Sequence, residues 1–209
     1  MSGTIRGIGG LVMVAVLVAA GGCGGGEDGG GAQADGLPRF VSGFEAMCKE
    51  ATAFDGAAEY EDGSDPYPIA LLRHLEEVDT YFLETGLPEG RVAPEIANPD
   101  DPDPAERERM AEISVVGCID VGESEPSGST CDYEDDDGGD VTTLEVLDAT
   151  YVVTLHEAKT ATVIDTVEIE VAGADHTCPI VASIDEGETT MLPSVDPDVL
   201  DEAIAGVLG

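Results

Sequence analysis

Histidines are the natural first candidates for chemistry in this chain, because an imidazole titrates near neutral pH and binds metals. There are three of them, at positions 74, 156 and 176. His156-Glu157 begins like the H-E-x-x-H motif of zinc proteases, but Thr160 occupies the position of the second histidine. We therefore expect His156 to lie on the polar face of a strand and His176 to lie in a turn, and we expect neither to bind a metal.

Other catalytic motifs are also incomplete. The segment Gly122-Glu123-Ser124-Glu125-Pro126 departs from the G-x-S-x-G pattern of a nucleophile elbow. Gly24-Gly25-Gly26 is not placed between a strand and a helix, as a phosphate-binding loop would be. Carboxylates are so numerous that no pair stands out as acid and base. We predict that the protein is not an enzyme and uses no cofactor.

An acidic segment is the strongest candidate for a ligand site. Calcium takes six to eight oxygen ligands, and extracellular modules often bind it weakly. The EF-hand pattern is not met in register, so the favoured interpretation is a solvated turn between strands. A weak calcium site is the alternative. Its carboxylates are Asp132, Glu134, Asp135, Asp136, Asp137 and Asp140.

Cys23 follows a short apolar segment near the start of the chain. Arg6 precedes an apolar run, Leu11 to Ala20, of a length typical of a secretory signal and too short for a comfortable membrane span. Ala20-Gly21-Gly22-Cys23 resembles the lipobox of bacterial lipoproteins. The resemblance implies cleavage before Cys23 and a lipid on its sulfur, which would attach the protein to the membrane. The alternatives are a cleaved signal with an incidental cysteine, or an uncleaved anchor.

The chain divides into three parts on composition. Residues 1–22 form the predicted signal, residues 23–37 a glycine-rich acidic tether, and residues 38–209 a single β-rich domain of ordinary size. Thirteen residues of flexible coil, from Gly24 to Gly36, reach about 20 Å. We therefore expect the domain to stand off the membrane surface.

Acidic residues dominate the composition. There are 45 Asp and Glu against 8 Lys and Arg, for a formal net charge of −37. Such a surface repels nucleic acid and anionic lipids, so we exclude nucleic-acid binding. Two explanations for the acidity stay open: adaptation to high salt, and a source proteome rich in acidic residues.

Four cysteines remain once Cys23 is assigned to lipid. An even number in an exported chain favours disulfides, and three connectivities exist. None of the four belongs to a C-x-x-C pair, which argues against zinc or redox chemistry. Cys118 and Cys131, thirteen residues apart, could face each other on paired strands if a turn separates them.

Alternating apolar and polar residues predict the strands. We expect a polar turn over Glu123–Thr130, and a bulge near Asp148 because the strand containing it is long. Residues 157–162 should form another turn. Residues 78–83 form either a strand or a helical turn. The expected strands are Pro68–Leu72, Ile113–Val121, Cys131–Tyr133, Val141–Leu155, Val163–Val171 and Cys178–Ala182.

Helices are expected near both ends of the domain. Phe40, Phe44 and Met47 have helical spacing within residues 38–54, where a short strand is the alternative. Asp196-Pro197 starts a C-terminal helix with an N-cap and a proline in the first turn. Residues 105–110 form a helical turn. The predicted fold is mostly β: an antiparallel sheet or sandwich of about six to eight strands with short terminal helices and two disulfides.

A set of segments stands out along the chain: Ala57-Ala58-Glu59-Tyr60, Pro66–Leu72, Val115–Ile119, Cys131-Asp132-Tyr133, Leu155–Thr160 and Cys178-Pro179. Together they resemble a family of uncharacterised bacterial envelope-protein domains. The chain departs from this family at Ala161, where a turn glycine would be usual, and in an acidic proline-rich insertion at residues 98–104. The resemblance implies a disulfide-bonded β-domain outside a membrane, with bridges Cys118–Cys131 and Cys48–Cys178. It implies no activity.

The predicted function is that of a non-enzymatic, lipid-anchored, extracytoplasmic module that binds or supports another envelope protein. A weak calcium-binding module using the segment from Asp132 to Asp140 is the second hypothesis. A hydrolytic enzyme without a recognisable motif is the third.

Overall fold

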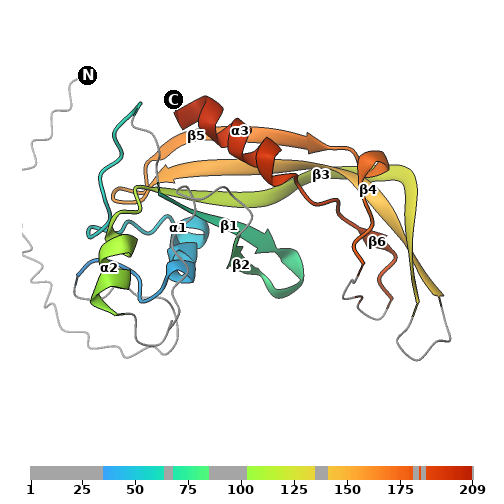
Figure 1. The fold of residues 1–209 in the computed structure, drawn as a ribbon, viewed down its shortest axis with the longest axis horizontal. Coiled ribbons are helices and arrows are strands. Elements are labelled where there is room, and N and C mark those ends of the chain that lie inside the picture. The colour runs from blue at the N-terminus through green and yellow to red at the C-terminus, as the bar shows by residue number, and fades with distance from the viewer. Residues whose placement is uncertain are drawn as a thin grey trace, which may run out of the picture.

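A computed structural model describes residues 35–63, 68–84, 103–134, 141–180, 184 and 187–208. Within these ranges the chain forms one six-stranded sheet, three α-helices and three short 3-10 turns (Figure 1). The strands are β1 (Ile69–Leu75), β2 (Thr80–Leu83), β3 (Val115–Glu134), β4 (Val141–Glu157), β5 (Val163–Val171) and β6 (Thr190–Met191). The helices and 3-10 turns are α1 (Glu45–Glu50), α2 (Pro104–Ala111), α3 (Pro197–Leu208), η1 (Val41–Phe44), η2 (Glu76–Val78) and η3 (Gly173–Asp175).

The predicted mostly-β fold is confirmed, and the sheet is mixed. Its strand order is β2-β1-β3-β4-β5, with β6 pairing the free side of one end of β4. The β1–β3 and β4–β6 pairs are parallel, while the other pairs are antiparallel. A parallel neighbour needs a long crossover connection. The chain between β1 and β3 supplies one, because it contains both β2 and α2.

The expected turn over Glu123–Thr130 is wrong, because these residues continue β3. Two register shifts against β4, between Val121 and Ser124 and between Pro126 and Ser129, place extra residues in β3. Extra residues on one strand bend a ribbon and increase its twist. The bulge expected at Asp148 therefore lies on the opposite strand, and the far part of β3 and β4 turns away from the main sheet (Figure 1). We call this bent part, residues 127–134 and 141–146, the arm.

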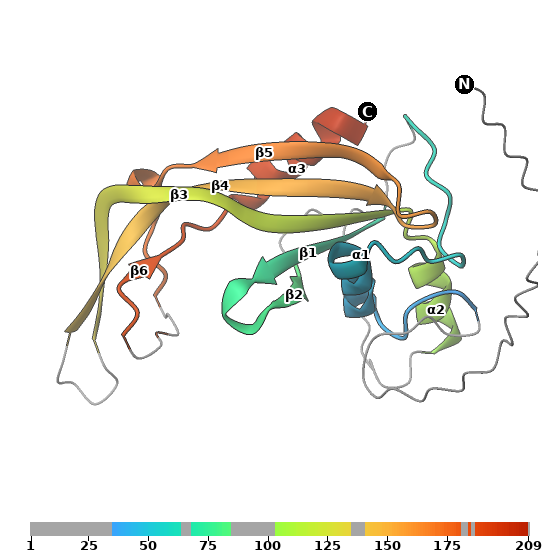
Figure 2. The same ribbon diagram turned by 180° about the vertical axis from the view of Figure 1, so that it is seen from behind.

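The central strands are buried on both faces. Side chains alternate between the faces, so Ala70 and Leu72 of β1 face α1 while Ile69 and Leu71 face α3. This accounts for the continuous apolar run in β1, which is typical of a strand covered on both sides. The two views show α3 on one side of the sheet and α1 and α2 towards the other (Figures 1 and 2).

The helices begin and end where local chemistry predicts. Asp196 caps α3 by accepting a hydrogen bond from the Asp198 amide at 2.8 Å, so the predicted C-terminal helix is confirmed. The predicted N-terminal helix is also present, as η1 followed by α1. The predicted turn at 105–110 belongs to α2, which starts with a capping box between Asp103 and Glu106.

Three other expectations have mixed outcomes. Residues 78–83 combine both alternatives, because η2 ends at Val78 and β2 follows. The β4–β5 turn is confirmed, and Ala161 within it has a φ of 57°, the left-handed conformation that favours glycine. Residues 178–180 are not in a strand, and residues 181–182 lie outside the described ranges. The late strand is β6, further along the chain.

The disulfide pairing implied by the resemblance is wrong. The structure joins Cys48 to Cys118 and Cys131 to Cys178, with Cα–Cα separations of 5.6 and 5.7 Å. Cys118 and Cys131 lie on the same strand, β3. Thirteen residues of extended strand span about 40 Å, so these two sulfurs cannot meet. The expected pair depended on the turn that the chain does not make.

Candidate functional site

The β1–β2 hairpin brings several ionisable side chains together against β3. His74 and Tyr81 are cross-strand neighbours, and their rings stack with centroids 4.7 Å apart. The Tyr81 hydroxyl donates to Asp120 Oδ1 of β3 at 2.7 Å. His74 Nδ1 lies 3.6 Å from the same oxygen, and Nε2 lies 3.2 Å from Asp79 Oδ1. The hairpin is thereby fastened to β3.

The electrostatics of this group favour a positioning role. Burial raises the pKa of Tyr81, and the hydrogen bond to Asp120 and the charges of Asp120 and Asp79 raise it further. A phenol with a raised pKa stays protonated and acts as a donor. Both imidazole nitrogens of His74 face carboxylates, so its polar atoms are directed within the group and not towards a substrate.

Replacing Tyr81 by phenylalanine tests this group. We expect a loss of about 1–2 kcal/mol of unfolding free energy, because a hydrogen bond to a charged acceptor is removed. The pKa of Tyr81 is higher in the folded state than in the unfolded state, where it is near 10, so the protonated phenol stabilises the folded state at pH values below about 10. This stabilisation is lost as the pH rises above that value. Urea unfolding from pH 8 to 11 should therefore show a decline in wild type that is reduced in Tyr81→Phe. Parallel declines would contradict this role for the phenol.

A second polar group lies on the opposite face of the sheet. Arg73 pairs with Glu84, with Nε 2.8 Å from Oε2, and its guanidinium carbon lies 5.4 Å from the Tyr151 ring centroid. The Tyr151 hydroxyl donates to the Pro193 carbonyl at 2.6 Å. Burial raises the pKa of Tyr151. The hydroxyl therefore ties the segment before α3 to the middle of β4.

Two hollows lie beside the bend of the sheet. The larger, about 680 Å³, is lined by β3, β4 and β5 and carries the carboxylates of Glu123, Glu125, Asp148 and Glu170. The smaller, about 480 Å³, shares Glu170, Val171 and Ala172 with the first and extends to the start of α3. Both are open to solvent. We call the larger one the bend groove.

The predicted site residues fall in several places. Cys23, Asp135, Asp136, Asp137 and Asp140 lie outside the described residues. Of the acidic segment, Asp132 and Glu134 are described, at the end of β3, and Asp132 Oδ1 accepts a hydrogen bond from Thr143 Oγ1 at 2.6 Å. Within the described ranges no three His, Cys, Asp or Glu side chains form a metal-binding group. The calcium hypothesis stays a prediction.

His156 and His176 occupy the positions expected of them, on a strand and beside a turn. His156 lies half-buried on β4, with Nδ1 3.4 Å from the Ala161 carbonyl oxygen. His176 follows η3 at the rim of the smaller hollow, and its Nε2 is buried without a hydrogen-bond partner. Sequence reasoning missed the grouping of His74 with Tyr81 and Asp120. This grouping could have been predicted only from a β1–β2 hairpin, which places positions 74 and 81 opposite each other.

No family model, curated protein sequence or solved structure matches this chain. The resemblance to envelope-protein domains and to lipoproteins therefore stays a prediction. The two disulfides indicate an oxidising, extracytoplasmic compartment. In the part of the chain that the structure describes, no helix is both long and apolar enough to cross a membrane.

Proposed function

We propose that this protein is a lipid-anchored, extracytoplasmic module that binds another envelope protein and does not catalyse a reaction. The segment ending in Ala20-Gly21-Gly22-Cys23 supports the lipid anchor. Two disulfides around a mixed sheet support a domain built for the oxidising side of a membrane. The observation that carries the binding role is the open, carboxylate-lined bend groove.

An open groove suits a macromolecular partner better than a small substrate. Small-molecule sites usually bury most of the ligand in a largely apolar, concave cavity. The bend groove is open and carries four carboxylates along its sides. His74, Asp79, Tyr81 and Asp120 form the polar group at the β1–β2 hairpin, and their described polar contacts join them to one another. These features support recognition of a surface over conversion of a substrate.

The start of the described chain lies far from the bend groove. Arg107 of α2 pairs with Asp35, and its Nη1 donates to the Pro38 carbonyl at 2.7 Å, so α2 holds the start of the described chain. Both views place α2 and the bend of β3 and β4 at opposite ends of the molecule (Figures 1 and 2). A tether from Cys23 would therefore enter at the α2 end and present the bend away from its point of attachment.

The charge of the groove specifies the chemistry of the partner. With a formal net charge of −37 and carboxylates lining the groove, the protein attracts a surface rich in lysine and arginine. Complementary charge mainly accelerates association and selects partners, and salt screens it over about 10 Å at 0.1 M. The interaction should therefore weaken as ionic strength rises.

Site-specific photo-crosslinking in native membranes tests the proposal. A photoreactive residue at Ser124, in the bend groove, should give a discrete crosslinked product with an envelope protein, and salt should reduce its yield. The matched control is Thr160, which is exposed in the β4–β5 turn. Absence of a product at Ser124, or identical products from both positions, would contradict binding at the groove.

A further inference from the structure

The two disulfides differ in how exposed their sulfur-bearing residues are. Cys118 is 3% exposed in the core beneath α1, and Cys48 is half-buried against the same cluster. Cys131 is 1% exposed, whereas its partner Cys178 is exposed. Disulfide exchange requires a thiolate to reach one of the two sulfurs, so access helps to set the rate. Only the second bridge offers an exposed cysteine.

The segment that carries Cys178 is fixed at both ends independently of the disulfide. Before it, the Gly173 amide donates to Asp148 Oδ1 at 2.7 Å. After it, the Tyr151 hydroxyl binds the Pro193 carbonyl at 2.6 Å, and Val195 enters the core. Both hydrogen bonds attach the segment to β4, at Asp148 and at Tyr151. Because these anchors do not depend on the disulfide, opening the bridge would leave the main sheet and α3 in place.

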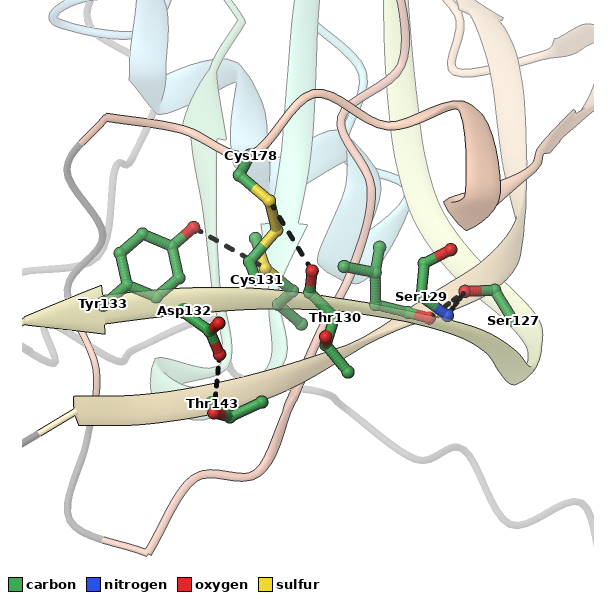
Figure 3. Close-up of a disulfide and its surroundings, with 10 residues drawn as sticks. Ser127, Ser129, Thr130, Cys131, Asp132, Tyr133, Thr143 and Cys178 are labelled. Atoms are coloured by element: carbon green, nitrogen blue, oxygen red, sulfur yellow. Dashed lines mark hydrogen bonds between the residues drawn. A yellow bond between two sulfur atoms is a disulfide. The ribbon is translucent and has the colours of Figure 1, made fainter.

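The described part of this stretch meets the arm through a short strand pairing as well as through the disulfide. β6 pairs with β4 at two positions, Glu145 with Thr190 and Val146 with Met191. The Tyr133 hydroxyl lies 3.8 Å from Met191 Sδ. Figure 3 shows the segment passing over the arm, with Cys178 reaching down to Cys131. The Glu145 amide also donates to the Thr189 carbonyl at 2.9 Å, and Cys178 Sγ lies 3.9 Å from the Thr130 carbonyl oxygen. These described contacts are short strand pairing and weak sulfur contacts, whereas Cys118 is enclosed by the core.

Beneath this stretch the arm carries apolar side chains. Cys131 and Leu144 are register partners on β3 and β4, and Leu144 is 2% exposed. Val146, on the same face, is 1% exposed. Loss of the covering segment would expose these side chains at the end of the molecule far from α2. An exposed apolar patch on a soluble surface is a typical protein-interaction site.

We propose that Cys131–Cys178 is a redox-sensitive latch, opened by a dithiol that attacks Cys178 Sγ, while Cys48–Cys118 stays closed. The attacking thiolate bonds to Cys178 Sγ and breaks the bond to Cys131, which leaves as a thiolate and takes up a proton. The second thiol of the dithiol, as its thiolate, then attacks the dithiol sulfur bonded to Cys178. This step frees Cys178, which also becomes protonated, and oxidises the dithiol to a disulfide, so two electrons pass to the protein.

Partial reduction of the folded wild-type protein tests the latch. The reagent is dithiothreitol, a neutral dithiol, since the acidic surface repels anionic thiols. Free thiols are alkylated at intervals and assigned by peptide mass spectrometry. We expect Cys131 and Cys178 to become alkylated at least about tenfold faster than Cys48 and Cys118. Equal rates, or faster opening of Cys48–Cys118, would overturn the proposal.

Hydrogen exchange on the partly reduced protein tests the local nature of the change. Faster exchange should be confined to the stretch containing Cys178 and β6, and to the facing arm. Exchange in β1, the first half of β3 and α3 should stay slow. Faster exchange throughout the sheet would show that opening the bridge unfolds the domain, and would overturn the latch.

A pair of variants separates the latch from general loss of stability. Cys131→Ser/Cys178→Ser should stay folded and bind a dye specific for exposed apolar surface more strongly than wild type does. The matched control, Cys48→Ser/Cys118→Ser, alters the enclosed bridge. Dye binding no greater than that of wild type in the folded first variant would contradict exposure of the arm. The reduction rates of the wild-type protein decide the proposal even if a variant fails to fold.

Discussion

Replacing Cys48 and Cys118 together by alanine is expected to lower the free energy of unfolding by about 4 kcal/mol. The bridge joins positions 70 residues apart, so its loss greatly increases the freedom of the unfolded chain. It also fastens α1 to β3, and Cys118 is packed in the core. Urea unfolding followed by circular dichroism measures the effect.

The matched comparison is Cys131→Ala/Cys178→Ala. This bridge closes a similar length of chain, with a separation of 47 residues. Its removal also frees a segment of the native state, and that recovered entropy offsets part of the cost. We therefore expect a clearly smaller loss than for the first pair. An equal or larger loss would contradict the unequal roles of the two bridges, as would a loss below about 1 kcal/mol for Cys48→Ala/Cys118→Ala.

Replacing Cys23 by serine is expected to move nearly all of the protein from the membrane fraction to the soluble fraction. Serine lacks the sulfur that would carry the lipid. Two acyl chains hold a protein stably at a membrane, because each buried methylene contributes about 0.8 kcal/mol. Fractionation of cells with antibody detection measures the shift. A variant that stays membrane-bound would favour an uncleaved anchor.

Strong local patterns predicted much of the sheet. The alternation in Val163–Val171 gave the bounds of β5, and the apolar run after Pro68 gave β1. Both patterns depend on which side chains must be buried, and the residue type at each position indicates whether it is buried. The cap at Asp196 predicted α3 for a similar reason, since a helix start needs a local acceptor.

The course of β3 could not be predicted from local composition. Residues 123–130 contain serine, proline and glycine, which are typical of turns. Pairing with β4 overrides that preference, and the register shifts accommodate Pro126 as well as Gly128, whose φ is 79°. A strand extended by tertiary pairing leaves no signal in its own residues.

The pairing of the two predicted disulfides and the position of the candidate site could not be predicted, for the same reason. A turn over Glu123–Thr130 would place Cys118 and Cys131 on different strands, whereas they share β3. The bend groove combines residues of β3, β4 and β5 that come together only at the bend. The position of the groove depends on the register shifts between β3 and β4, and these cannot be predicted from the spacing of residues along the sequence.

The lipid anchor proposed at Cys23 is tested most directly by the mass of the mature N-terminus. Protein extracted from native membranes is digested, and its N-terminal peptide is analysed by mass spectrometry. We predict a peptide that begins at Cys23 and carries a diacylglyceryl group on its sulfur. An N-terminal peptide that begins elsewhere, or an unmodified Cys23, would contradict the anchor.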